Sequence, residues 1–466
     1  MPAKRPDIVV IAVDTLRPDH LGCYGYPRPT SPAVDRLAEQ SVVFDQAFAA
    51  GIPTTPAFTT LLSGLHPYHH QVVSHPGGHP LDAKIQLLSQ LAKAGGYLTV
   101  ACDNLVVQGA GRGTWFARGY DHYSGFLYAP FGDQSRQLTD RALSFVQGAR
   151  EEPLFLFIHY WDPHTPYGPL PPYDTLHYEP GSGPVEMSEV RAIHPDYYDA
   201  FVADMKLRHP DDYAYIVAQY DGEITQVDTQ VGRLLDGLRA SRGWDDTVVL
   251  LVSDHGECFG EGGLYFDHHG LYDAVIRTTM MLRTPSGERG RCDALVSHED
   301  VLPTLCELAN LELPPYPLTG RSVLPLLSGS ARSIRPYVVS TESTRQASVA
   351  WRTATEKLIV PVTHDAGGEP LPDLYGRPRR PDPLLFDLTA DPGERQDLAA
   401  EEPQRVARLR AELDAWTADT LAVAGQPDPI ATQGLSLPYD RFMERVLHRL
   451  APEAAKGTPP TDASPH

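Results

Sequence analysis

Residues 7–15 read DIVVIAVDT, an uninterrupted apolar run that stops at Asp14. A continuous run rich in β-branched residues is typical of a central strand in a parallel sheet, because helices cover both faces of such a strand. In open α/β sheets, ligands bind beyond the carboxyl ends of the strands. Asp14 is therefore a candidate site residue, and capping of the following turn is its alternative role.

Three further apolar runs end in polar residues in the same way. They are LTVACDN at 98–104, PLFLFIHYWDPH at 153–164 and TVVLLVSDH at 247–255. We expect each run to form a strand whose carboxyl end lies at the same sheet edge as Asp14. The residues delivered there are Asp103, Asn104, His159, Asp162, His164, Asp254 and His255. His164 is a candidate for the site, with a structural role as the alternative.

The third of these runs carries the densest group of ionisable residues. A carboxylate and an imidazole that are adjacent at a strand end can ligate one cation from a single turn. The glycine-rich loop that follows carries Glu257, Glu261, Asp267, His268 and His269. Glycines allow that loop to fold close over an ion. We therefore expect Asp254 and His255 to hold a metal ion.

A second candidate stretch, GIPTTPAFTTLLSGLHP at 51–67, places Thr54 and Thr55 between two prolines. Proline is tolerated in the first turn of a helix, so the pattern predicts a short helix with one threonine at its N-cap. A hydroxyl at a helix N-terminus lies among free N–H groups that favour an anion or an alkoxide. We take Thr54 as the reactive residue and Thr55 as the second candidate. Both threonines have simple capping as the alternative.

A histidine-rich segment follows, with His66, His69, His70, His75 and His79. Such a cluster can contribute to a metal or anion site, or can be a set of solvated loop residues. His70 is the member that we retain as a candidate substrate-binding residue.

Composition narrows the class of protein. The chain has 466 residues, a formal net charge of −21 and a pI near 5.3. Such an acidic balance argues against a nucleic-acid or anionic-membrane partner, because either needs a basic surface. The five cysteines lack CxxC spacing, and residues 8–13 are too short for a secretion signal. We therefore expect a cytoplasmic protein.

The chain divides into segments of different character. Residues 1–330 predict an α/β catalytic domain, with an irregular, lid-like insert at 165–215. Residues 331–425 predict a small α+β domain with an antiparallel sheet. Residues 426–466 predict a helix near 438–450, which can serve as an oligomer arm, and a disordered tail. A long helix over 213–238 should expose the acids of its segment 221–228 to solvent.

Taken together, several motifs resemble the sulfatase family of the alkaline phosphatase superfamily. They are VVIAVDTLRPDHLGCYGYPRPTSPAVDRLA, TTLLSGLHP, FLFIHYWDPHTPY, VVLLVSDHGECFGEGGLYFDHHGLYDAVIRTTMMLRTP and LLFDLTADPGERQDLA. The resemblance implies an alkaline-phosphatase-like α/β core around a large mixed sheet flanked by helices. It also implies a divalent metal held by Asp14, Asp254, His255 and the nucleophile Thr54. Thr15 replaces a second acid that the family often carries.

His255 stands where many sulfatases carry asparagine. In this respect the chain is similar to the phosphonate monoester hydrolase and phosphodiesterase branch. Imidazole suits Mn²⁺ or Zn²⁺ better than Ca²⁺ or Mg²⁺, so the first two are favoured and the others remain possible. A second ion, held by Asp162, His164 and His268, is an open possibility.

The chain departs from the sulfatases at the nucleophile. Sulfatases carry Cys or Ser in a CxPSR-like motif that becomes formylglycine, whereas this chain reads Thr54-Thr55-Pro56-Ala57-Phe58. Threonine cannot become that aldehyde. A threonine ester must instead be cleaved by water at the transferred group, as in metal-assisted phosphoryl transfer.

The predicted function is hydrolysis of phosphate or phosphonate esters through a covalent phosphothreonine. Thr54 attacks a small anionic ester, and either His268 or His164 protonates the leaving oxygen. Predicted substrate-binding residues are Thr55, His70, Asn104 and Asp162. Sulfate ester hydrolysis without formylglycine and anion binding without turnover are the alternatives.

Overall fold

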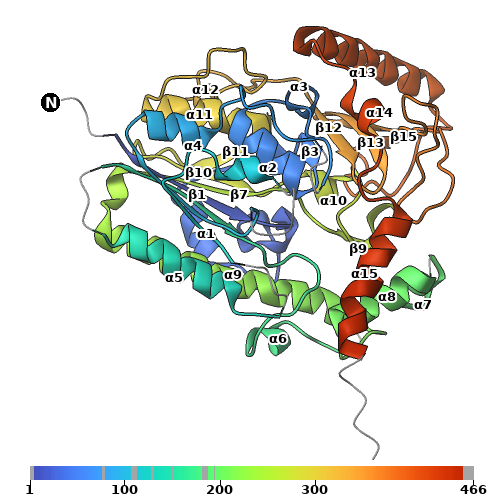
Figure 1. Ribbon diagram of the computed structural model, residues 1–466, viewed down its shortest axis with the longest axis horizontal. Helices are drawn as coiled ribbons and strands as arrows, with labels where there is room; N and C mark the ends of the chain where they lie inside the picture. Colours follow the sequence, from blue (N-terminus) through green and yellow to red (C-terminus); the bar gives the residue numbers. More distant parts are fainter. Residues whose placement is uncertain are drawn as a thin grey trace, which may run out of the picture.

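The computed structural model describes residues 5–75, 79–106, 113–126, 131–148, 152–180, 187–193 and 195–454. An eight-stranded sheet with the order β11-β2-β10-β7-β1-β6-β4-β5 runs through its centre (Figure 1). The strands are β1 (Asp7–Val13), β2 (Val42–Phe48), β4 (Leu98–Cys102), β5 (His122–Ser124), β6 (Leu154–Tyr160), β7 (Thr247–Ser253), β10 (Met280–Arg283) and β11 (Gly290–Ser297). Neighbouring strands are parallel except at β10, which is antiparallel to β2 and β7. The predicted mixed α/β sheet is confirmed.

Helices cover both faces of this sheet (Figure 1). One face packs against α1 (Pro32–Ala38), α5 (Gln134–Val146) and α9 (Tyr213–Ser241). The other face packs against α2 (Thr54–Ser63), α4 (Leu88–Ala94) and α11 (Val301–Ala309), with α12 (Leu324–Leu327) nearby. This two-sided burial explains why the central strands read as unbroken apolar runs.

Strand alternation decides on which face the site is built. In β1, Val9, Ile11 and Val13 pack on the α9 side, whereas Ile8, Val10 and Ala12 pack on the α2 side. Because side chains alternate along a strand, Asp14 continues the set that faces α2. The same alternation places His159 of β6 and Asp254 after β7 on the α2 side. The end of the sheet therefore collects polar groups beside the N-terminus of α2.

The second sheet has the order β15-β14-β13-β12-β3. Its strands are β3 (Gly51–Ile52), β12 (Tyr337–Ser343), β13 (Ala347–Thr353), β14 (Glu356–Pro361) and β15 (Leu384–Asp387), covered by α13 (Pro403–Ala424) and α14 (Pro429–Gln433). The four C-terminal strands are antiparallel as predicted, and β12 pairs in parallel with β3. Since β3 directly precedes Pro53 and Thr54, the second sheet is attached to the start of α2.

The insert at 165–215 differs from the sequence prediction. Its described parts contain three helices, α6 (Tyr173–Leu176), α7 (Met187–Ile193) and α8 (Pro195–Met205), rather than irregular chain alone. The C-terminal helix α15 (Tyr439–Ala454) packs against α8 of the same chain (Figure 1). The expected disordered tail lies, from residue 455 on, outside the described residues. Within the described parts of the chain, no helix has the length and apolar character to cross a membrane.

The expectation that α9 exposes its acids is wrong. Asp221, Glu223 and Asp228 are all buried. Asp221 accepts hydrogen bonds from Tyr26 and Arg28 and pairs with His20, while Asp228 accepts from the N–H groups of Ala33 and Val34 at the start of α1. A helix covered on several sides uses its acids to satisfy neighbouring donors, and periodicity alone does not reveal those neighbours.

The remaining short elements lie around the loops at the sheet edge. They are α3 (Pro67–His70), β8 (Cys258–Phe259), β9 (Tyr265–Asp267) and α10 (Asp273–Ile276).

Candidate active site

Three fully buried side chains form a compact ligand set at the sheet edge. One ligand atom each from Asp14, Asp254 and His255 lies within 4.8 Å of the others. Asp14 Oδ1 and Asp254 Oδ2 have no hydrogen-bond partner among the described residues. A buried carboxylate oxygen without a donor is costly unless a cation balances it. The donor set therefore fits a divalent metal ion.

The orientation of His255 supports the same conclusion. Its Nδ1 lies 3.0 Å from the carbonyl oxygen of Gly256, so this nitrogen donates and Nε2 keeps its lone pair. Nε2 faces Asp254 Oδ2 at 3.2 Å and Thr54 Oγ1 at 3.4 Å. A backbone carbonyl that fixes the tautomer in this way is the usual support of a metal-ligating histidine.

Asp14 and Asp254 differ in their electrostatic surroundings. Burial opposes ionisation of Asp14, but the hydrogen bond from His159 and the nearby imidazoles lower the pKa of Asp14 below its ordinary value. Burial and the charge of Asp14 together raise the pKa of Asp254 to about 6. Backbone N–H groups of Thr15 and His255 donate to Asp254 Oδ1 at 3.1 and 2.8 Å. Thr15 reaches this position with a φ of 51°, a left-handed conformation that is strained for a β-branched residue.

His159 supports Asp14 from behind. Its Nδ1 lies 2.8 Å from Asp103 Oδ1, and its Nε2 lies 3.3 Å from Asp14 Oδ2. Burial opposes a charge on this ring, but the two carboxylates raise the pKa of His159 to about 9. The imidazolium therefore fixes one oxygen of Asp14 and leaves the other directed at the ligand set.

The structure distinguishes the two adjacent threonines. Thr54 is the first residue of α2, and Pro53 occupies the N-cap without any side-chain cap bond, so neither threonine has the predicted capping role. Thr54 Oγ1 lies 3.5 Å from Asp14 Oδ2 and 3.4 Å from His255 Nε2. Thr55 Oγ1 instead lies 2.7 Å from His75 Nδ1. The hydroxyl that faces the ligand set is that of Thr54.

His164 and His268 lie next to each other at the mouth of the site. The ring centroid of His268 lies 4.9 Å from that of His164 and 4.8 Å from that of His255. Burial lowers the pKa of His164 to about 3, and its Nδ1 donates to the carbonyl of Thr165. Burial opposes a charge on His268, but Glu257 at 3.7 Å raises the pKa of His268 to about 9. His268 is thus the protonated member of the pair and His164 the neutral one.

Three predicted substrate-binding residues are engaged elsewhere. His70 uses both ring nitrogens, one with Thr60 Oγ1 and one with the N–H of Val72. Asn104 uses both ends of its amide, with Gln134 Oε1 and the N–H of Phe126. These two side chains hold α2 and the loop after β4 in place, and substrate binding by either of them stays a prediction.

Asp162 is the third of these residues. It lies against α9, where Gln226 Nε2 donates to its Oδ2 at 3.4 Å, and burial raises its pKa to about 6. None of its described hydrogen-bond partners belongs to the ligand set. A second ion held jointly by Asp162, His164 and His268 gains no support from this placement.

Sequence reasoning missed the residues that orient the site. Asp103 and Glu257 appear in the motifs, but their partners, His159 and His268, become known only in three dimensions. Glu342 of β12, which lies 3.0 Å from His269 Nδ1, comes from the C-terminal sheet. The sequence did hold one signal for His159, since an ionisable residue inside the apolar run 154–160 needs a buried partner.

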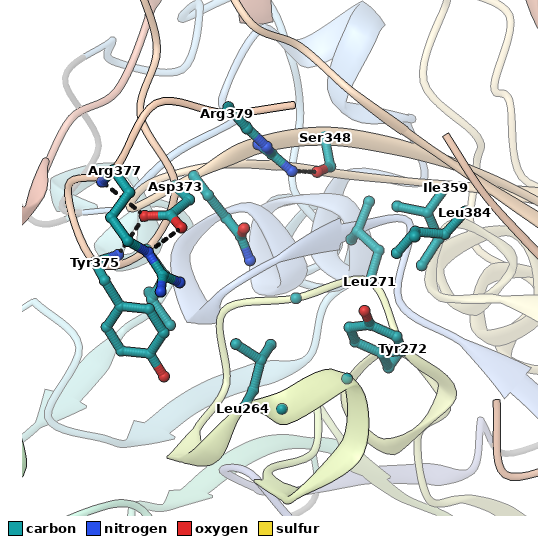
Figure 2. A pocket seen from close by; sticks show the side chains of 15 residues that line it. Leu264, Leu271, Tyr272, Ser348, Ile359, Asp373, Tyr375, Arg377, Arg379 and Leu384 are labelled. Carbon is teal, nitrogen blue, oxygen red and sulfur yellow. Dashed lines mark hydrogen bonds and ion pairs between the residues drawn. The ribbon is translucent and has the colours of Figure 1, made fainter. Parts of the chain in front are cut away.

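Two pockets flank the segment that carries His268 and His269. One, of about 260 Å³, is lined by His164, His268 and a group of aromatic side chains. The other, of about 390 Å³, is lined by Leu264, Tyr272 and two arginines. Figure 2 shows that in this larger pocket Arg377 pairs with Asp373 and Arg379 with Ser348. Only the smaller pocket includes candidate catalytic residues in its wall.

The sulfatase family model matches residues 6–311. This chain belongs to the sulfatase family, whose members are hydrolases of the alkaline phosphatase superfamily. An uncharacterized sulfatase of Escherichia coli (strain K12), YidJ, is 25% identical over 369 residues, which cover 69% of this chain and 71% of the relative. The multifunctional alkaline phosphatase superfamily protein PehA of Trinickia caryophylli is 25% identical over 412 residues, covering 70% and 77%.

Solved structures agree on the fold of this sulfatase-family chain. The phosphonate monoester hydrolase of Agrobacterium radiobacter superposes with a TM-score of 0.71 at 23% identity, covering 90% of this chain and 96% of that one. The phosphonate monoester hydrolase SpPMH of Silicibacter pomeroyi gives a TM-score of 0.70 at 21% identity, covering 89% and 96%. The likeness confirms the alkaline-phosphatase-like architecture.

Proposed function

We propose that this sulfatase-family chain hydrolyses phosphate or phosphonate esters, with Thr54 as the nucleophile. The observation that carries the proposal is the position of Thr54 Oγ1 beside both Asp14 and His255. The start of α2 holds threonine where a formylglycine-dependent sulfatase needs cysteine or serine. The nucleophile must therefore form an ordinary ester.

Asp14, Asp254 and His255 would hold a divalent cation, and the imidazole ligand favours Mn²⁺ or Zn²⁺. When bound, the cation lowers the pKa of a coordinated hydroxyl and balances the negative charge that develops on the transferred group. Free N–H groups in the first turn of α2 lie at the same place and favour the same anionic species.

In the first step, the Thr54 alkoxide attacks phosphorus and the bond to the leaving oxygen breaks. His268, held protonated by Glu257, gives its proton to that oxygen, so the alcohol leaves neutral. In the second step, water attacks the phosphothreonine and returns a proton to His268. Thr54 is released as the alkoxide, and phosphate or phosphonate departs. Neutral His164 accepts hydrogen bonds beside this path.

A panel of four aryl esters tests the proposal: a phosphate monoester, a phosphate diester, a phosphonate monoester and a sulfate ester, each with Mn²⁺, Zn²⁺ or Ca²⁺. We expect turnover of phosphorus esters with Mn²⁺ or Zn²⁺. Activity confined to the sulfate ester overturns the preference for phosphorus. Turnover of none of the four means that the chain binds anions without reaction.

The matched pair Thr54→Ala and Thr55→Ala tests the nucleophile. We expect Thr54→Ala to lose turnover and Thr55→Ala to keep it, because only the Thr54 hydroxyl faces the ligand set. Mass spectrometry after rapid acid quench should find the transferred group on the peptide that contains Thr54. Full activity of Thr54→Ala would contradict the assignment.

A further inference from the structure

The pocket next to His164 and His268 has a predominantly aromatic and apolar wall. We call it the aromatic pocket and define it by Trp161, Phe201, Phe266, Arg345, Phe442 and Val446. Phe201 comes from α8 in the insert, and Phe442 and Val446 come from α15. These two helices pack together at the side of the sheet edge (Figure 1). The insert and the C-terminal helix thus supply part of the wall, and the rest, including His164 and His268, comes from the loops at the sheet edge.

The arginine in the wall of this pocket is paired with a carboxylate of the same wall. Among the described residues of its wall, Arg345 is the only arginine or lysine. Its guanidinium donates to Asp267 Oδ2 at 2.7 Å and lies 3.7 Å from the ring centroid of Phe442. The Tyr197 hydroxyl donates to the same Asp267 oxygen. Arg345 is therefore already engaged, and it attracts a further anionic group on a ligand less than an unpaired arginine would.

The rings in the wall favour a flat ligand. Phe201 and Phe266 stack with centroids 5.1 Å apart and an interplanar angle of 11°. Tyr197 and Phe442 stack at 5.9 Å. A cavity of about 150 Å³ is known to accommodate benzene, so about 260 Å³ suits one substituted ring. The Arg345 and Tyr197 side chains both donate to Asp267, so these three polar groups of the wall are already engaged with one another.

We propose that the aromatic pocket binds the leaving group of the ester and that this group is an uncharged aromatic alcohol. The inference rests on the proposed function, because His268, the proton donor to the leaving oxygen, lies in the wall of this pocket. An alcohol bonded to that oxygen extends from Thr54 past His268 into the space beside Phe442. The larger pocket in Figure 2 does not suit this role, because neither His164 nor His268 lines it.

The test compares two phosphonate monoesters whose alcohols are matched in acidity, one aryl and one fluorinated alkyl. Matched acidity separates binding of the leaving group from its chemical reactivity. We expect the aryl ester to have the lower KM. Phe442→Ala should raise the KM of the aryl ester roughly tenfold, in line with the loss of one ring contact, and leave the KM of the alkyl ester unchanged. Phe442→Leu should restore part of the affinity, because it keeps apolar volume.

Leu447→Ala is the matched control. Leu447 lies on the same helix, but its side chain is 58% exposed, so its removal should leave both KM values unchanged. Equal effects of Phe442→Ala on the two esters, or equal effects of the two variants on the aryl ester, would overturn the assignment. The assignment is supported if Phe442→Ala raises the KM of the aryl ester alone and Leu447→Ala raises neither KM.

A binding measurement separates this inference from the proposed function. Titration calorimetry with 4-nitrophenol, using the Thr54→Ala protein, needs no turnover. Binding that is lost in Thr54→Ala/Phe442→Ala and kept in Thr54→Ala/Leu447→Ala supports the pocket even if none of the four esters is hydrolysed. Turnover of phosphorus esters without such binding refutes the pocket and leaves the proposed function intact.

Discussion

Replacing Asp254 by asparagine should stabilise the chelator-treated protein and abolish its response to metal. Asp14 and Asp254 are fully buried, and their ligand oxygens lie at most 4.8 Å apart. Two unit charges at 4.8 Å repel by about 3.5 kcal/mol at an effective dielectric constant of about 20. The nearby imidazolium of His159 offsets part of this repulsion. We therefore expect Asp254→Asn to raise the stability of the metal-free protein by about 2 kcal/mol at mildly alkaline pH.

The substitution should cost little in other contacts. Asparagine Oδ1 can still accept from the N–H groups of Thr15 and His255, as Asp254 Oδ1 does at 3.1 and 2.8 Å. Its Nδ2 can donate to His255 Nε2, which lies 3.2 Å from the present Asp254 Oδ2. The same change removes a ligand. In the wild type, metal at a hundred times its dissociation constant should add about 2.7 kcal/mol of stability, and this increment should disappear in Asp254→Asn.

Thermal unfolding with chelator and with Mn²⁺ measures both effects. Asp228→Asn is the matched control, because Asp228 is also buried and also accepts two backbone N–H groups, but it is not part of the ligand set. The control should keep the wild-type response to metal. If Asp254→Asn lowers the stability of the chelated protein, or still responds to Mn²⁺ as the wild type does, then the carboxylate pair is a structural network rather than a metal site.

Two further predictions concern groups whose environment the sequence did not reveal. Glu257→Gln removes the negative charge that, against the effect of burial, raises the pKa of His268 to about 9. Activity that depends on protonated His268 falls as pH rises through this pKa, so the alkaline limb of the pH–kcat profile should move to lower pH. An unmoved limb would exclude His268 as the acid. Asp221→Ala removes the shared acceptor of Tyr26 and Arg28 and should lower the free energy of unfolding, measured in urea, by about 3 kcal/mol. Asp236→Ala is the control on the same helix. Its side chain is 79% exposed, so the free energy of unfolding should change by less than about 0.5 kcal/mol.

Much of the core could be predicted because its strands are buried on both faces. A strand covered on both sides by helices is apolar along most of its length, and the polar residues that follow it mark the sheet edge. This logic located Asp14 and the pair Asp254 and His255 without any knowledge of their partners. The structure brings those three residues together as one ligand set. The antiparallel sheet predicted for residues 331–425 is also present, as short strands joined in sequence order.

What the sequence could not supply has one physical cause. Whether a polar side chain is a ligand, a cap or a support depends on which donors surround it, and those donors come from distant parts of the chain. His70 and the loop histidines looked alike in sequence, yet His70 is closed off by Thr60 and Val72. The acids of α9 followed a helical pattern that suits solvent, yet the neighbouring elements bury them. The hydrophobic pattern of a segment locates a helix or strand well, but it does not show which other elements pack against it.

The contribution of the C-terminal sheet shows how the site depends on such distant neighbours. Strand β12 pairs with β3, the two residues that lead into Pro53 and Thr54, and so fixes where α2 begins. The same strand supplies Glu342 to His269, and the turn after it supplies Arg345 to Asp267. Both partners flank His268. One strand therefore helps to position both Thr54 and His268, although it carries neither.

Under the proposed function, this arrangement places the reaction and the binding of the leaving group on different elements. The ligand set and Thr54 stand on strand ends and on the first turn of a buried helix, where packing permits little movement. The aromatic pocket takes Phe201 from α8 and Phe442 and Val446 from α15, two helices that lie outside the central sheet and contact each other. Changes in these two helices can alter which alcohol is accepted without moving Asp14, Thr54 or His255. Selectivity for the leaving group should thus respond to substitutions in α8 and α15, and the reaction itself to substitutions at the strand ends.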